Sequence, residues 1–175
     1  MQRDFNLIVT TARGNEEDAC SEIWYLLGEI GDTAAEIEKT AVKGLVIART
    51  ALDPFDVIAA FRGMLREQPG ELRYSLRIIP IERVVQTDLQ EIQEVATELA
   101  SKIRADETFR VTVEKRFSGI SSREIIQAAA ANIDRKVSLE DPNRIVLVEV
   151  IGELTGVSVI APADILPIGK ERPDV

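Results

Sequence analysis

The sequence contains no histidine and a single cysteine, Cys20. Without histidine the chain cannot build a serine–histidine or cysteine–histidine nucleophile system, an imidazole general base, or an imidazole metal site. One thiol forms neither an intramolecular disulfide nor a multi-thiolate metal site, and Cys20 is interpreted as a packing residue. We therefore expect no catalytic residue, no metal site and no cofactor.

Long apolar runs are also missing, because even Ile145–Ile151 is interrupted by Glu149. A membrane-spanning helix needs about 20 consecutive apolar residues. The N-terminal residues lead directly into a strand-like segment and lack the apolar core of a signal peptide. We therefore expect a cytoplasmic protein.

The net charge of −9 over 175 residues argues against a protein that coats nucleic acid through its overall field. A local basic patch remains possible, because the acidic residues gather in predicted helices while residues 109–169 carry nearly balanced charge. The basic residues of that stretch are Arg110, Lys115, Arg116, Arg123, Arg135, Lys136 and Arg144. This stretch is the place to look for an anion-binding surface.

The first eighty residues alternate between strand and helix patterns. Asn15 is interpreted as the N-cap of one helix and Asp53, followed by proline, as the N-cap of the next. The pattern predicts strands at Phe5–Thr11, 34–40, 45–50 and 72–78, with helices at Glu16–Glu29 and Pro54–Glu67. The order β-α-β-β-α-β predicts a ferredoxin-like domain over residues 1–83, and an α+β class.

The second half of the chain, like the first, contains both helix and strand patterns. Thr87 and Gln90 resemble a capping box, as do Ser121 and Glu124, and each pair stands before a helical stripe. Strands are predicted at Phe109–Arg116, Arg144–Ile151 and 157–161, with a turn at Asp141-Pro142. This α/β domain is expected to span residues 84–168, and a polar surface tail to cover 169–175.

One corner of the second half combines charge with free backbone donors. The strand that begins at Phe109 ends in Lys115 and Arg116, and the next helix begins at Ser121. The first N–H groups of a helix have no partner within the helix and attract anions. The pattern therefore predicts a site for an anion, most simply a phosphate.

The second half resembles a THUMP domain in its order of elements. The residues that carry the resemblance are a leading amphipathic helix, the strand ending in Lys115-Arg116, the serine-started helix, the Asp141-Pro142 turn and the Ile145–Ile151 strand. The ferredoxin-like unit before it is similar to the module that usually precedes THUMP in tRNA-modifying proteins. Together the two resemblances cover nearly the whole chain.

The resemblance implies a tRNA-binding module, a kind of domain generally fused to a catalytic domain. The sequence contains no Ser-Gly-Gly pyrophosphatase loop, no glycine-rich cofactor loop and no Asn-Pro-Pro motif. Among THUMP proteins it is most similar to the type that assists tRNA cytidine N4-acetylation, in which a separate acetyltransferase performs the reaction. The implied partners are thus tRNA and a tRNA-modifying enzyme.

Each candidate contact has a competing structural interpretation. Lys115 and Arg116 are expected to contact tRNA phosphates, Arg116 bidentately, unless they form surface ion pairs at a solvated strand end. Ser121 and Ser122 are interpreted first as a helix cap and second as phosphate ligands. For Arg123, a structural role at the start of the helix and a phosphate-binding role are weighted equally. Arg135, Lys136 and Arg144 either extend the basic patch or complement the dipole at the C-terminus of their helix.

The remaining candidates are aromatic or lie in the first half. Phe117 either stacks on a base or, as the preferred interpretation, anchors its turn to the body of the domain. Trp24 and Tyr25 are read as core residues or a docking surface, and Arg13, Arg73 and Arg77 as solvent contacts or a second basic strip.

Three functions follow from these observations. The first is a tRNA-binding adaptor that presents tRNA to a modification enzyme. The second is a protein-interaction module whose acidic helices dock a basic partner, with little RNA binding of its own. The third, an enzyme or ligand-binding protein built on paired ferredoxin-like folds, has no convergent acid–base pair to support it.

Overall fold

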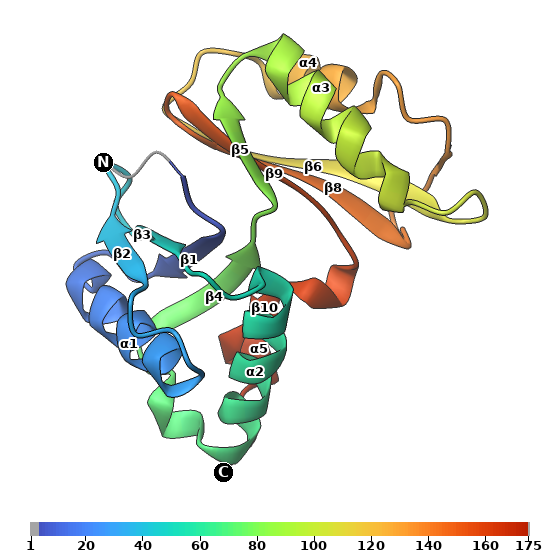
Figure 1. The fold of residues 1–175 in the computed structure, drawn as a ribbon. Coiled ribbons are helices and arrows are strands. Elements are labelled where there is room, and N and C mark those ends of the chain that lie inside the picture. The colour runs from blue at the N-terminus through green and yellow to red at the C-terminus, as the bar shows by residue number, and fades with distance from the viewer. Residues whose placement is uncertain (1–3, 175) are drawn as a thin grey trace. The chain divides into compact units, whose positions relative to one another are not determined.

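The N-terminal residues fold in the predicted β-α-β-β-α-β order. The computed structural model describes residues 4–174. The elements are β1 Leu7–Thr11, α1 Glu16–Glu29, β2 Glu36–Lys39, β3 Leu45–Arg49, α2 Pro54–Glu67 and β4 Ser75–Pro80, with a short 3-10 turn at Pro69–Glu71 (Figure 1). The strands are antiparallel in the order β4-β1-β3-β2, which confirms the ferredoxin-like arrangement and the α+β class.

The two helices of this unit begin in different ways. Asp53 caps α2 as predicted, because its Oδ1 accepts hydrogen bonds from the N–H groups of Phe55 and Asp56, at 2.8 and 3.4 Å. Asn15 precedes α1 but makes no side-chain cap hydrogen bond. The carboxylate of Glu16 turns outward instead and accepts the N–H groups of Gly14 and Gly44.

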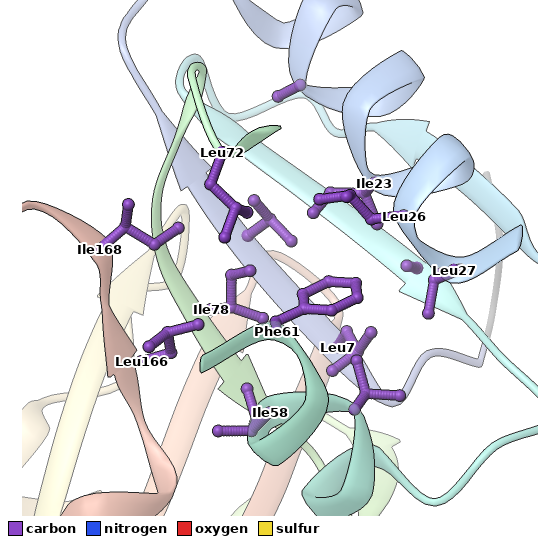
Figure 2. Close-up of a cluster of buried hydrophobic side chains, with 14 of the residues drawn as sticks. Leu7, Ile23, Leu26, Leu27, Ile58, Phe61, Leu72, Ile78, Leu166 and Ile168 are labelled. Atoms are coloured by element: carbon purple, nitrogen blue, oxygen red, sulfur yellow. The ribbon is translucent and has the colours of Figure 1, made fainter. Parts of the chain in front are cut away.

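The core of this unit lies between one face of the sheet and both helices. Figure 2 shows Ile23, Leu26 and Leu27 of α1 pointing toward Phe61 of α2 and the strands beneath. The helix spacing explains this arrangement, since residues three and four apart share one face. These side chains are almost completely buried.

Strand β4 departs from the predicted alternation. Thr10 pairs with Arg77 and Thr11 with Ser75, so Leu76 is skipped in a bulge. The bulge exposes Leu76 and buries Ser75. The Ser75 hydroxyl and N–H both donate to the Glu22 carboxylate of α1, at 2.7 and 2.8 Å. In the sequence Leu72, Tyr74, Leu76 and Ile78 alternate with polar residues, which predicts that Leu76 points inward. That prediction is wrong, because the inward position is taken by Ser75, which is hydrogen-bonded to the Glu22 carboxylate.

The C-terminal residues differ from the expected surface tail. The chain divides into Met1–Ile81 with Asp164–Val175, and Glu82–Ala163, so the last residues belong with the first unit. Strand β10, Leu166–Pro167, pairs with β4, and helix α5 covers Ile168–Glu171. Two apolar side chains, Leu166 and Ile168, are buried in the first core (Figure 2). Burial of these two side chains holds the C-terminal segment against the first unit.

The second unit is a mixed sheet with two helices on one face. Its elements are β5 Arg83–Gln86, α3 Leu89–Leu99, β6 Thr108–Arg116, α4 Ser122–Ala130, β7 Lys136–Val137, β8 Arg144–Ile151 and β9 Leu154–Ile160, with 3-10 turns at Ala100–Lys102 and Pro162–Asp164 (Figure 1). The sheet order is β5-β9-β8-β6-β7. Strand β6 is parallel to both β7 and β8. Helices α3 and α4 pack together over β9 and β6.

One predicted detail of this unit is wrong, and one strand was not predicted. Asp88, not Thr87, caps α3, because its Oδ2 accepts the N–H of Glu91 at 3.1 Å. Thr87 forms a hydroxyl–hydroxyl bond with Thr155 at 2.8 Å. Strand β5, which no sequence pattern predicted, begins two residues after Ile81, where the two units divide, and pairs with β9. No helix among residues 4–174 has the length and apolar character that a membrane span requires.

The packing of the C-terminal segment on the first unit is stabilised by a pH-dependent ion pair between α5 and α2. Arg62 Nε lies 2.7 Å from Glu171 Oε1, and a second N–H of Arg62 donates to Oε2 at 3.1 Å. This hydrogen bonding from Arg62 holds the pKa of Glu171 below its ordinary value of 4.5. Ionised Glu171 therefore stabilises the fold above its ordinary pKa, and this contribution disappears as pH falls through the lowered value.

We expect Glu171→Gln to reduce the free energy of unfolding by about 1–2 kcal/mol near pH 7, because a charged hydrogen bond is lost. The loss should shrink toward zero in strong acid, as the pH falls through the lowered pKa of Glu171. Urea titrations followed by the fluorescence of Trp24, the single tryptophan, report on this unit. Glu67→Gln at an exposed position is the matched control. An equal loss near neutral pH and in strong acid would contradict the assignment.

Candidate nucleic-acid interface

The C-terminal end of β6 places two cations at the edge of the second sheet. Side chains alternate along this strand, so Val111 and Val113 face the helices while Arg116 lies on the opposite face. The carbonyl of Arg116 accepts the N–H of Gly152 at 2.8 Å, which fixes the strand end beside the β8–β9 turn. The chain then reverses into α4.

Arg116 is partly committed to a structural role. Its NH1 donates to Oε2 of Glu149 at 2.7 Å, and the Glu149 side chain is completely buried in β8. The side chain of Arg116 is 19% exposed. A guanidinium carries five N–H donors, and this bond uses one of them. Arg116 therefore stabilises the sheet and also presents positive charge at its rim.

Lys115 and Arg123 are the accessible cations of this corner. Lys115 is exposed and its Nζ donates to the carbonyl of Ile120 at 2.9 Å, which holds the loop between β6 and α4. Arg123 is exposed in the first turn of α4. Both side chains keep donors directed toward solvent, because an ammonium has three N–H groups and a guanidinium five.

Ser121 caps the helix, as the preferred interpretation predicted, and Ser122 is the first residue of α4. Ser121 Oγ accepts the N–H of Glu124 at 3.1 Å, and the Ser121 carbonyl accepts the N–H of Ile125. The geometry of a helix leaves the N–H groups of its first two residues, Ser122 and Arg123, pointing out of its N-terminus. The helix dipole adds partial positive charge there, although Glu124 in the same turn offsets part of it.

Phe117 lies between the cations and the helix and does not anchor the loop. Its side chain is 71% exposed, so the preferred interpretation from sequence is wrong. Its φ is 57°, the one positive value at a non-glycine residue among residues 4–174. A left-handed conformation costs a side-chain-bearing residue roughly 1–2 kcal/mol. We use the name basic corner for Lys115, Arg116, Phe117, Ser122 and Arg123.

Two predicted contacts lie at the other end of the sheet. Lys136 pairs in register with Thr108 and Arg144 with Phe109, both at the start of β6. A strand rises about 3.3 Å per residue, so roughly 25 Å of β6 separates them from the basic corner. Arg144 pairs there with Glu107 at 3.4 Å, while Lys136 is exposed. The structure does not bring these residues to the same patch.

Arg110 and Arg135, the remaining candidate arginines of the second unit, donate to backbone carbonyls. Arg135 donates to the carbonyls of Ile103, Arg104 and Asp134, which ties the segment after α4 to the turn after α3. Arg110 donates to the carbonyl of Leu139 at 2.9 Å. The contacts of Arg135 with Ile103 and Arg104, and of Arg110 with Leu139, have no sequence signal, because each joins residues about 30 positions apart. The basic corner thus depends on Lys115 and Arg123, with Arg116 as a shared residue.

Comparison with known proteins identifies the second unit. A family model described as "THUMP domain" matches residues 86–160, which include the whole basic corner. No curated protein sequence matches the chain.

Several solved structures have a similar fold. PH1313 from Pyrococcus horikoshii has a TM-score of 0.70 at 18% identity, over 90% of this chain and 55% of that one. TrmN from Thermus thermophilus gives 0.56 at 20% identity, over 91% and 47%. A 4-thiouridine synthetase in complex with RNA and ATP gives 0.58 at 14% identity, over 90% and 41%. The chain spans about half the length of these proteins, and the likenesses show the fold.

Proposed function

Because residues 86–160 form a THUMP domain, we propose that the protein binds tRNA and takes part in its modification as an adaptor, without performing the reaction itself. The observation that carries the proposal is the basic corner. There an exposed lysine and an exposed arginine flank the N-terminus of α4, next to an exposed aromatic ring. This set offers charge, backbone donors and a stacking surface to one nucleic acid strand.

Each component of the basic corner suits a different part of RNA. Lys115 and Arg123 supply the cations that phosphates need, and the N–H groups at the start of α4 supply directed donors. Phe117 offers a flat surface to an unpaired base, as aromatic residues do in RNA recognition. Contacts of this kind recognise the shape of the RNA backbone and unpaired bases rather than a long nucleotide sequence. They are suited to a folded RNA such as tRNA.

One structural relative supports the RNA assignment by what its name states, the 4-thiouridine synthetase in complex with RNA. Two further neighbours are described as a predicted N6-adenine-specific DNA methylase and a possible methylase. We propose that this chain presents tRNA to a separate acetyltransferase for cytidine N4-acetylation, following the resemblance found in the sequence. Service to a thiolation or methylation enzyme is the second candidate, which these relatives favour.

We expect Lys115→Gln combined with Arg123→Gln to weaken tRNA binding about tenfold near 100 mM salt, because two phosphate contacts are lost. The slope of log affinity against log salt should decrease by about two, roughly one for each cation. Binding of unmodified tRNA across a salt series measures both quantities.

The matched control is Lys136→Gln, an exposed lysine at the far end of the sheet. It should leave the affinity and the slope nearly unchanged. Arg116 is avoided in this test, because its removal takes a cationic partner from buried Glu149 and would destabilise the sheet by about 3 kcal/mol. A double variant that binds tRNA as the parent protein does would exclude the basic corner.

Phe117→Gly separates a binding role from a packing role. Glycine adopts positive φ without steric cost, so this change should leave stability unchanged or raise it by about 1 kcal/mol. Loss of a stacked base should weaken tRNA binding by about 1–3 kcal/mol. Chemical denaturation and tRNA binding are measured on the same preparations.

Phe117→Tyr keeps the ring and should restore binding. If Phe117→Gly lowers stability and binding together, the ring packs rather than stacks. If the affinity of Phe117→Gly equals that of the parent protein, the ring has no part in the interface.

Cells that lack this chain should lose N4-acetylcytidine from tRNA if the proposed partner is correct. Mass spectrometry of tRNA nucleosides makes the measurement. The parent gene and the Lys136→Gln variant should restore the nucleoside, whereas the Lys115→Gln and Arg123→Gln double variant should restore it poorly. Loss of a thiolated or methylated nucleoside instead would support the second candidate, and an unchanged nucleoside profile would remove both.

A further inference from the structure

An apolar groove lies between helix α1 and strand β2 of the first unit. Its volume is about 650 Å³, and it is lined by Cys20, Ser21, Trp24, Tyr25, Ala35, Glu36 and Ile37. Cys20 and Ile37 pack against the core and form its inner part. Trp24 and Tyr25 are 56% and 49% exposed. Two adjacent exposed aromatic residues on one helix are unusual for a surface that meets only water.

The strand beside the groove has an open edge. Within residues 4–174, β2 is the last strand on its side of the sheet and pairs with β3 alone. Alternate residues of a strand point to opposite faces. Ile37 points toward α1 and the core, so Glu36, one residue earlier, points to the other face. A strand added at this edge would likewise direct every second side chain toward Trp24.

The charge around the groove is negative. Helix α1 contains five acidic residues and no basic one: Glu16, Glu17, Asp18, Glu22 and Glu29. Three of them already have partners, since Glu16 and Glu22 accept backbone N–H groups and Glu17 pairs with Lys39. Asp18 and Glu29 remain exposed, as does Glu36 on β2. The field here repels RNA and attracts basic side chains.

Two further observations narrow the choice of occupant. The negative charges of Glu29 and Glu71 raise the pKa of Tyr25, so the acidic field extends to the aromatic residues themselves. A second copy of this chain has the same acidic helix α1 and a net charge of −9, so its approach to this surface is opposed by like-charge repulsion. A protein segment of opposite charge meets neither obstacle.

We propose that this groove binds an extended basic segment of a protein partner, which adds to the edge of β2 as a further strand. Apolar side chains at alternate positions fill the groove against Trp24, Tyr25 and Ile37, and lysine or arginine at the positions between them points to the other face of the sheet, where Glu36 lies. Main-chain hydrogen bonds supply affinity and the alternation supplies specificity, as in other cases of strand addition. The groove is in the first unit, so the proposal does not depend on tRNA binding by the basic corner.

A designed peptide of about seven residues, in which lysine alternates with valine or leucine, tests the proposal. We expect saturable binding that changes Trp24 fluorescence and slows amide hydrogen exchange within Glu36–Lys39. Trp24→Ala, whose binding is followed by hydrogen exchange because it removes the single tryptophan, should lower the affinity at least about fivefold through loss of an aromatic anchor. Glu36→Lys should lower it similarly. Glu67→Lys reverses an exposed charge on α2 of the same unit and should change little.

The same measurements contain the outcomes that would overturn the proposal. A peptide of equal composition with its lysines grouped at one end should bind at least about fivefold more weakly, and equal binding would reduce the effect to charge alone. Peptide binding without slowed exchange in β2 would exclude strand addition. Protection of β2 by single-stranded RNA, or by dimerisation seen in sedimentation without peptide, would assign the groove to another occupant.

Discussion

Parallel pairing of β6 with β8 is the constraint on which the basic corner depends. Two parallel strands cannot be joined by a tight turn, so the chain must cross back over the sheet. Helix α4 makes this crossing, and its N-terminus therefore follows directly after the C-terminal end of β6. A strand that ends in two cations and a helix that begins with free N–H groups meet there. The strand topology thus gathers cations and free N–H groups at one corner of a chain whose net charge is −9.

The ion pair between Arg116 and Glu149 links this corner to the interior of the sheet. A buried carboxylate is costly unless it is paired and hydrogen-bonded, so Arg116 is needed for stability whatever it contributes to RNA binding. Lys115 and Arg123 have no buried ionic partner in the described residues, and Lys115 donates only to the loop carbonyl of Ile120. In the proposed interface these two cations could therefore be changed at less structural cost than Arg116.

Local signals predicted much of the fold, and non-local contacts account for what was missed. Both first-unit helices and strand β8 were predicted at their observed bounds, because caps and periodicity lie within the sequence window. Strand β5 and the Leu166–Pro167 strand are short and form only by pairing with distant residues. The bulge at Leu76 depends on the Glu22 carboxylate, which is 53 residues from Ser75. The exposure of Phe117 follows from its backbone conformation, which no sequence pattern indicated.

The two units carry surfaces of opposite chemistry, as the proposed adaptor function requires. The THUMP domain offers cations and a helix N-terminus, which phosphates favour, whereas α1 and β2 offer carboxylates around exposed aromatic rings. Each surface disfavours the other's ligand, since RNA is repelled by the acidic groove and a basic segment by the basic corner. An RNA and a protein can then be bound by one chain without competing. Joining two ligands on one chain raises their local concentration, and this gain requires no catalytic group in the adaptor.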